Sequence, residues 1–277
     1  MSGIVLEPRV LPARFGWRWI VSGFELFRRA PLAWTSLVLV FLLLLVTMTY
    51  VPFVGPMLFI LLYPVFFAGF MHGCAALDSG RELDIAHLFS GFRGRAAALV
   101  SLGGMNLVAQ IVIAGILVAT VGDRLGAMER GADTNDPAAA LAWLQQLSLP
   151  MAFYLLLSLP LVMAMWFAPT LLAFHDVKPL AAARASFRAC LVNVGAFAVY
   201  GATHLALLLL VTPTVVWVVT ALLSPLIGSG LGTQILLSVM LGAVALILFV
   251  TMVASNYAGY RDVFESASDS RLPVESA

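Results

Sequence analysis

Long runs of apolar residues, separated by short polar segments, dominate the pattern along the chain. Six runs carry no charged residue, and each is long enough to cross the hydrocarbon core of a bilayer as a helix of about 20 residues. They cover residues 32–51, 57–77, 96–122, 149–174, 191–219 and 234–257. Pro160 and Pro169 predict a bend in the fourth run. The pattern predicts an all-α, polytopic membrane helix bundle with six transmembrane helices in one domain over residues 1–277.

The composition supports this fold class and excludes others. Hydrophobic residues make up 62% of the chain and charged residues 10%, whereas a soluble domain carries about 25% charged residues. This excess of apolar residues argues against a soluble enzyme and against a disordered chain. The net charge of +1 lacks the basic character of a nucleic-acid-binding protein, so no nucleic acid is expected as a partner.

The distribution of basic residues predicts the orientation. Thirteen of the fifteen Lys and Arg residues fall in the segments 1–31, 78–95, 175–190 and 261–277, which lie on one side of the predicted spans. The opposite side holds only Arg124 and Arg130, both within residues 123–148. By the positive-inside rule, we expect both termini in the cytoplasm and an external loop at 123–148. The six-span bundle then covers 32–260, after a cytoplasmic or interfacial segment at 1–31 and before a disordered cytoplasmic tail at 261–277.

A similar stretch of aromatic and basic residues precedes the first, third and fifth runs, at 24–30, 89–96 and 186–190. The first stretch ends a longer segment that is amphipathic at helical spacing. One face of this segment carries Trp17, Ile20, Phe24 and Phe27, and the opposite face carries Arg18, Ser22, Glu25 and Arg29. Such an amphipathic helix is typical of a segment that lies in the headgroup region.

The even-numbered runs also end alike, near 68–70, 172–174 and 258–260. The chain therefore reads as three parallel repeats, each consisting of an amphipathic interfacial helix and a transmembrane hairpin. The alternative is that any hairpin that starts inside collects Arg and aromatic residues at its base.

The segments 11–20, 27–34, 87–93 and 186–193 together resemble an uncharacterised family of proteobacterial six-span inner-membrane proteins. The resemblance extends over most of the chain and is least specific at 123–148. The sequences at 168–170 and 183–187 are also similar to the membrane domain attached to some glycerophosphodiester phosphodiesterases. The first resemblance implies a multi-pass protein of the bacterial inner membrane, part of the bacterial envelope, and it implies no particular chemistry.

Few polar residues remain within the spans. None of the residues in 31–77, 137–175 and 189–260 is Asp, Glu, Lys or Arg, which argues against a proton-coupled pump because such a pump normally needs a buried carboxylate. Asn106, Gln110, Asn193 and His204 are candidates for lining a polar cavity. The alternative is that they form hydrogen bonds between helices, as polar residues in membrane bundles commonly do.

No catalytic motif and no zinc-ligand spacing occurs in the sequence, so neither an enzyme, a metal nor a cofactor is expected. Cys74 and Cys190 are interpreted as small buried hydrophobic residues. An integral-membrane enzyme would require His175 and Asp176 to meet other polar groups in one pocket. Because adjacent residues on a helix do not face each other, a water-exposed helix end is the simpler reading.

Two functional hypotheses follow. In the first, the protein is a non-enzymatic envelope scaffold or accessory subunit, possessing an unidentified membrane-protein partner and bound to anionic lipids. Its lipid-headgroup contacts are Arg18, Arg28, Arg29, Arg93, Arg95, Arg184 and Arg188. In the second, it is a transporter or flippase for a lipid or apolar solute, and Asn106, Gln110, Asn193 and His204 line a cavity between the repeats. The two differ in whether these four residues converge.

Overall fold

The computed structural model describes residues 7–131, 137–228 and 230–265, and this part of the chain is helical without any strand. In chain order the elements are α1 (Phe15–Arg29), α2 (Pro31–Thr49), α3 (Val54–Asp78), the 3₁₀ helix η1 (Ile85–Phe92), α4 (Ala96–Gly131), α5 (Pro137–Trp166), α6 (Ala168–Phe174), α7 (Pro179–Val192), α8 (Val194–Trp217), the π-helical turn η2 (Val218–Leu223), α9 (Ser224–Ile227) and α10 (Leu231–Phe264). Six stretches are long and apolar enough to span a membrane: Pro31–Thr49, Val54–Asp78, Ala96–Thr120, Pro150–Phe174, Val194–Leu226 and Leu231–Phe264. The predicted all-α fold with six spans is confirmed.

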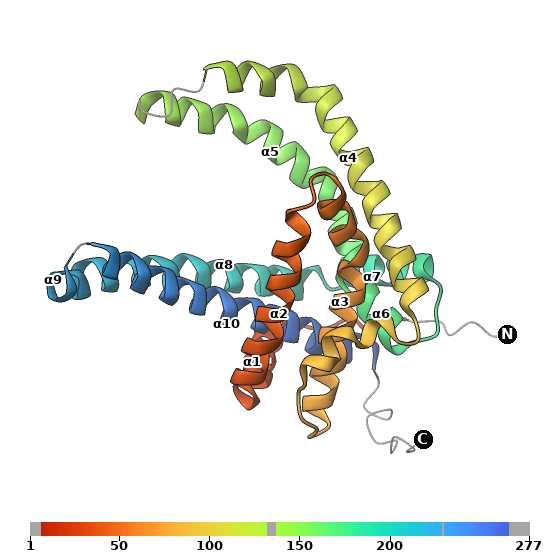
Figure 1. Cartoon of the computed structure of the whole chain (residues 1–277). Helices are drawn as coiled ribbons and strands as arrows, with labels where there is room; N and C mark the ends of the chain where they lie inside the picture. Colours follow the sequence, from red (N-terminus) through yellow and green to blue (C-terminus); the bar gives the residue numbers. More distant parts are fainter. Residues whose placement is uncertain (1–6, 132–136, 229, 266–277) are drawn as a thin grey trace.

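The long helices form three pairs, α2 with α3, α4 with α5, and α8 with α10. The pairs meet at one end of the molecule and spread apart toward the other, as the different directions of the α4–α5 and α8–α10 pairs show (Figure 1). We call the shared end the base. It contains α1, η1, α6, α7 and the parts of the long helices that contact them.

The buried core lies in the base. Its largest fully buried side chains include Trp19, Trp34, Phe70, Phe167 and Tyr260. Away from the base, the helices expose leucine and valine side chains, among them three successive leucines of α8 at 208–210. Apolar surface of this extent suits contact with lipid chains rather than with water.

Helix α1 packs against α10 and α8, two helices from the far end of the chain. Two glycines permit the contact: a Cβ atom at Gly23 would collide with the Thr251 carbonyl oxygen of α10, and one at Gly16 with the Ala196 carbonyl oxygen of α8. The indole Nε1 of Trp19 donates to Asp262 of α10 at 3.1 Å. The first helix is therefore an integral part of the base.

The second amphipathic stretch is the 3₁₀ helix η1, which packs along α3. Asp84 caps its start by accepting a hydrogen bond from the backbone N–H of Ala86 at 2.9 Å. The backbones approach closely because Gly69 of α3 meets the Leu88 carbonyl and Gly91 of η1 meets the Val65 carbonyl, with no room for a Cβ atom in either place. Gly73, one turn further along α3, lies against the Leu83 side chain just before η1.

The third amphipathic stretch, α7, packs against α5 and α6. Its Ser186 hydroxyl donates to the Met163 carbonyl at 2.7 Å and accepts a hydrogen bond from the Phe167 N–H at 2.9 Å. This hydroxyl thus stands between two groups that would bond directly in an unbroken α-helix. The bend between α5 and α6 at Phe167, predicted from Pro160 and Pro169, is held open by an inserted side chain.

These contacts follow one rule. The segments α1, η1 and α7, which precede the three pairs, each pack against the second helix of another pair: α1 on α10, η1 on α3 and α7 on α5. Gly23, Gly91 and Ser186 stand at the contacts, and the neighbours are the carbonyls of Thr251, Val65 and Met163. The threefold repeat by duplication stays a prediction.

Two segment boundaries differ from expectation. The segment 123–148 is helical on both sides of 132–136, since α4 continues to Gly131 and α5 begins at Pro137; its alanine- and leucine-rich composition favours helix over loop. Similarly, α10 continues through residues 261–264 of the predicted disordered tail, and Arg261 and Val263 contact Asp78 and Arg9 there. Residues 266–277, the rest of that tail, lie outside the described residues.

Candidate functional site

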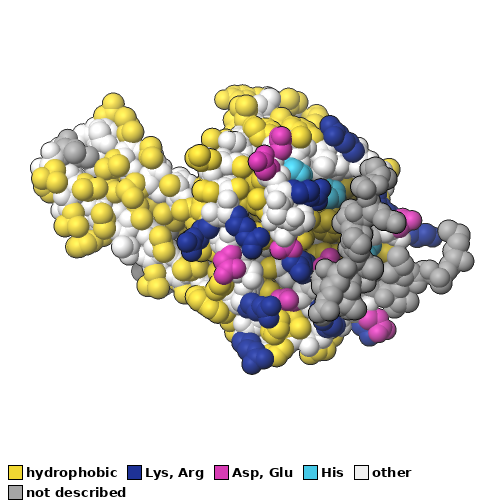
Figure 2. All heavy atoms as spheres, turned by 90° about the horizontal axis from the view of Figure 1, so that it is seen from below, with side chains coloured by type: hydrophobic (Ala, Val, Ile, Leu, Met, Phe, Trp, Pro, Cys, Tyr) yellow, Lys and Arg dark blue, Asp and Glu magenta, His cyan; other side chains and the backbone are white. Residues whose placement is uncertain are grey.

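Charged side chains gather on the face of the base (Figure 2). All seven arginines predicted to contact lipid headgroups lie in the segments of the base or at their ends. Arg18, Arg28, Arg29, Arg93, Arg184 and Arg188 are exposed, and Arg95 is partly buried. The structure therefore brings these arginines to one end of the molecule.

The outward face of α1 combines aromatic and basic side chains. Trp17 and Phe24 are 55% and 42% exposed. The guanidinium of Arg28 lies 6.0 Å from the ring centroid of Phe24, and that of Arg18 lies 5.1 Å from the ring centroid of Phe15. These are cation–π distances. Exposed aromatic rings beside cations are typical of a helix surface at the membrane–water interface.

The apolar residues of α1 do not all have the same surroundings. The helix buries Trp19, Ile20 and Leu26 together with its two glycines, whereas Trp17 and Phe24 face outward. The reason is that close packing on α8 and α10 requires the glycine side of the helix. The hydrophobic residues therefore divide between a packed face and an exposed face.

Arg95 has a different role from the other arginines. Its guanidinium donates to the carbonyls of His175 and Val177, the latter at 2.8 Å, and pairs with Asp176 at 2.8 Å. It thereby holds the chain that leaves α6 against the start of α4. His175 in turn bonds to the Tyr260 hydroxyl at 2.8 Å. His175 and Asp176 therefore contact different partners, although both line an open pocket together with Arg95.

A polar pocket of about 360 Å³ opens where α1, α3 and α10 meet. Arg261 pairs with Asp78 of α3 and lies 3.4 Å from Glu265. Arg29 donates to the Leu77 carbonyl at 3.4 Å, and Arg9 donates to the carbonyls of Arg261 and Glu265. Acidic and basic groups both line this pocket, and their contacts join the two ends of the described chain.

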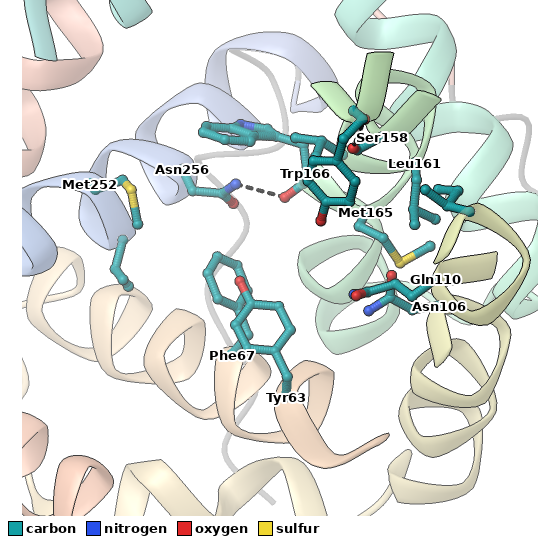
Figure 3. A pocket seen from close by; sticks show the side chains of 14 residues that line it. Tyr63, Phe67, Asn106, Gln110, Ser158, Leu161, Met165, Trp166, Met252 and Asn256 are labelled. Atoms are coloured by element: carbon teal, nitrogen blue, oxygen red, sulfur yellow. Dashed lines mark hydrogen bonds between the residues drawn. The ribbon is translucent and has the colours of Figure 1, made fainter. Parts of the chain in front are cut away.

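A second cavity, of about 290 Å³, lies between the helix pairs on the apolar side of the base. Tyr63 and Phe67 of α3, Asn106 and Gln110 of α4, and Asn256 of α10 line it (Figure 3). Residues of α5 complete the wall, with Tyr154, Ser158, Leu161, Met165 and Trp166 among them. Two of the four predicted cavity residues, Asn106 and Gln110, therefore meet in one cavity.

The other two lie elsewhere. Asn193 joins α7 and α8 to the N-terminal segment: its Oδ1 accepts from the Leu11 N–H at 2.7 Å, and its Nδ2 donates to the Arg9 carbonyl at 2.9 Å. His204 lies on α8, where its Nδ1 is 3.2 Å from the Tyr200 carbonyl. The four residues therefore do not line one cavity, and Asn193 forms hydrogen bonds that hold separate segments together.

Both cysteines are buried and unpaired, as expected. Burial raises the pKa of the Cys190 thiol to about 12, so this thiol stays protonated near neutral pH and is a poor nucleophile. Within the described residues, no three His, Cys, Asp or Glu side chains are grouped so as to hold a metal ion.

Several functional positions were not singled out in the sequence. The role of Ser186 could not be predicted, because nothing in the sequence distinguishes a serine that bonds to the backbone of another helix from any other small residue. Tyr63 and Tyr154 reach the cavity from two different pairs; their polar tips in otherwise apolar runs were an available signal. Asn256 was visible as a polar residue in a span, and it donates to the Trp166 carbonyl at 2.7 Å.

The chain is similar to a probable inner membrane protein of Burkholderia thailandensis. The two are 33% identical over 266 residues, which cover 91% of this chain and 92% of the relative. No protein family model matches the chain, and no solved structure matches it.

Proposed function

Because this chain belongs to the family of inner membrane proteins that includes the Burkholderia thailandensis relative, we propose that it is a non-enzymatic scaffold or accessory subunit of the bacterial envelope, anchored through its base to anionic lipid headgroups. The six spans fix it in the inner membrane. We propose further that the base faces the cytoplasm, with both termini on that side, because the excess of Lys and Arg lies there.

The observation that carries the proposal is the outward face of α1. There Arg28 lies over Phe24 and Arg18 over Phe15, while Trp17 is exposed beside them. Aromatic rings at headgroup depth hold the helix in the interface, and each arginine near an anionic surface contributes on the order of 1 kcal/mol.

The test removes two exposed arginines that make no hydrogen bond or ion pair within the described residues, Arg28 and Arg188. We expect the double variant R28Q/R188Q to retain fewer phosphatidylglycerol molecules than the wild type when native mass spectrometry follows release from mixed phosphatidylglycerol–phosphatidylcholine nanodiscs. The matched control, R28K/R188K, keeps both charges and should retain nearly the wild-type number. Equal phosphatidylglycerol retention in the glutamine variant and the wild type would contradict anchoring.

The accessory-subunit part has its own test. Native mass spectrometry of the protein released gently from its own membrane should show a second protein in fixed stoichiometry. Release as a lone chain that carries only one lipid species would instead favour the transporter or flippase alternative. That alternative has weaker support, because Asn193 and His204 lie away from the cavity that Asn106 and Gln110 line.

A further inference from the structure

The cavity between the helix pairs lies within the membrane-spanning segments, and Asn106 marks its position along α4. Asn106 is ten residues into the α4 span that begins at Ala96, which corresponds to roughly 15 Å of helix at 1.5 Å per residue. This is about half of a hydrocarbon core of roughly 30 Å. The walls come from α3, α4, α5 and α10, and therefore from all three helix pairs.

Among the polar residues that line this cavity, Asn106 is nearly buried and lacks a hydrogen-bond partner within the described part of the chain. Its side chain is only 9% exposed and lines the cavity beside Gln110 (Figure 3). Neither of these two amides forms a hydrogen bond with any other described residue. An unpartnered amide in an apolar environment costs free energy, roughly 1–3 kcal/mol by mutational measures.

Asn256, on the opposite wall, shows what a satisfied amide looks like in the same cavity. Its Nδ2 donates to the Trp166 carbonyl at 2.7 Å, and its Oδ1 accepts from the Thr170 hydroxyl at 2.9 Å. The Asn256 amide thus stabilises the bend between α5 and α6. The amide N–H groups of Asn106 and Gln110 remain available to donate to a ligand.

The lining sets the chemistry of a ligand. None of the fourteen residues around this cavity carries a charge, and most are aromatic or aliphatic. A charged headgroup at this depth would be buried without a counter-ion, which is costly. The amide N–H groups of α4, together with the hydroxyls of Tyr63 and Tyr154, offer donors to an acceptor oxygen.

We propose that this cavity binds an uncharged, membrane-dissolved lipid through its carbonyl oxygens, with Asn106 and Gln110 as the hydrogen-bond donors and the rings of Phe67 and Trp166 as apolar walls. A volume of about 290 Å³ holds roughly ten water-sized groups. This is enough for the carbonyl-bearing part of a lipid, while the remaining chain extends between the diverging helix pairs. The site is separate from the arginine surface of the base.

The test measures the unfolding temperature of the purified protein in detergent with increasing amounts of three lipids. Dioleoylglycerol and decylubiquinone are two sources of uncharged carbonyl groups, and dioleoyl phosphatidic acid adds a phosphate to the first. A ligand that binds only the folded state raises the unfolding temperature in a saturable way. We expect saturation with at least one uncharged lipid, and the lipid that saturates identifies the source. Stabilisation by phosphatidic acid equal to that by dioleoylglycerol, or no saturable effect of either uncharged lipid, would overturn the proposal.

Variants then locate the site. N106L/Q110L replaces both amides with side chains of similar size, and we expect at least a tenfold weaker apparent affinity for the stabilising lipid. The control Q234L removes an exposed glutamine amide of α10 outside the cavity and should bind as the wild type does. Without lipid, N106L/Q110L should unfold at the wild-type temperature or above, because the lost amides had no protein partner. Unchanged affinity in N106L/Q110L, or the same loss in Q234L, would refute the assignment.

Discussion

The backbone N–H of Phe167 donates to the side-chain hydroxyl of Ser186 at 2.9 Å, across the contact between α7 and the junction of α5 and α6. The same hydroxyl donates to the Met163 carbonyl, so one serine of α7 completes the hydrogen bonding of a bend in another helix. We expect S186A to lose about 1–3 kcal/mol of unfolding free energy, because the buried Phe167 N–H loses its acceptor and the Met163 carbonyl keeps the Cys190 thiol but loses the hydroxyl donor.

Thermal unfolding in detergent checks this expectation, with S101A as the control. Ser101 also donates to a backbone carbonyl, that of Ala97, but it is exposed and stays within its own helix. S101A should be nearly neutral. Equal unfolding temperatures for S186A and S101A would show that the bend closes without the hydroxyl.

Two adjacent glycines of α4 allow a matched test of close packing. A Cβ atom at Gly103 would collide with the Leu61 carbonyl oxygen of α3, whereas one at Gly104 would meet only the Leu61 Cδ1 at 3.8 Å. We expect G103A to destabilise the protein by about 1–3 kcal/mol through overpacking. G104A should be neutral or slightly stabilising, since alanine is the better helix former by up to about 1 kcal/mol. The unfolding temperature of G103A should be lower than that of G104A. A lower unfolding temperature for G104A would contradict the close contact between α3 and α4.

Arg95 and Asp176 form an ion pair whose two members should contribute unequally. The Asp176 side chain is 96% exposed, so D176N should cost less than about 1 kcal/mol. Arg95 also donates to the carbonyls of His175 and Val177. R95Q leaves the Val177 carbonyl without this donor and leaves the His175 carbonyl with the Val177 N–H, so the substitution should cost about 1–3 kcal/mol. Chemical or thermal unfolding of both variants measures the difference, and similar losses would indicate that the ion pair alone matters.

The two cysteines should resist thiol reagents in the folded protein. Burial raises the pKa of Cys190 to about 12, so at pH 8 only on the order of 1 in 10,000 of these thiols is the reactive thiolate. Cys74 is fully buried. We expect no maleimide labelling at pH 8 until detergent denaturation, after which both react. A181C, which places a thiol on the exposed side of α7, is the positive control; labelling of the folded wild type as fast as that of A181C would contradict the burial.

The six spans were predictable because a bilayer imposes length and apolarity on every crossing segment, and both are local properties of the sequence. The packing of the base was not. Only the fold shows that Gly69 of α3 lies against the backbone of η1. The sequence grouped Asn106 and Asn193 as candidates for one cavity, and separating the cavity-lining Asn106 from Asn193 required knowing which helices face each other.

The contact of α1 with α10 has a consequence for biosynthesis. Since α1 leaves the ribosome long before α10, its Gly23 has no packing partner while five spans are inserted, and Gly16 meets its partner only with the fifth of them, α8. The base therefore closes as a late, long-range step, which is intrinsically slow compared with the pairing of neighbouring helices. Chains halted before α10 would expose Trp19 and Ile20, the side chains that the finished protein hides, and such exposed surface is what quality-control proteases and chaperones recognise.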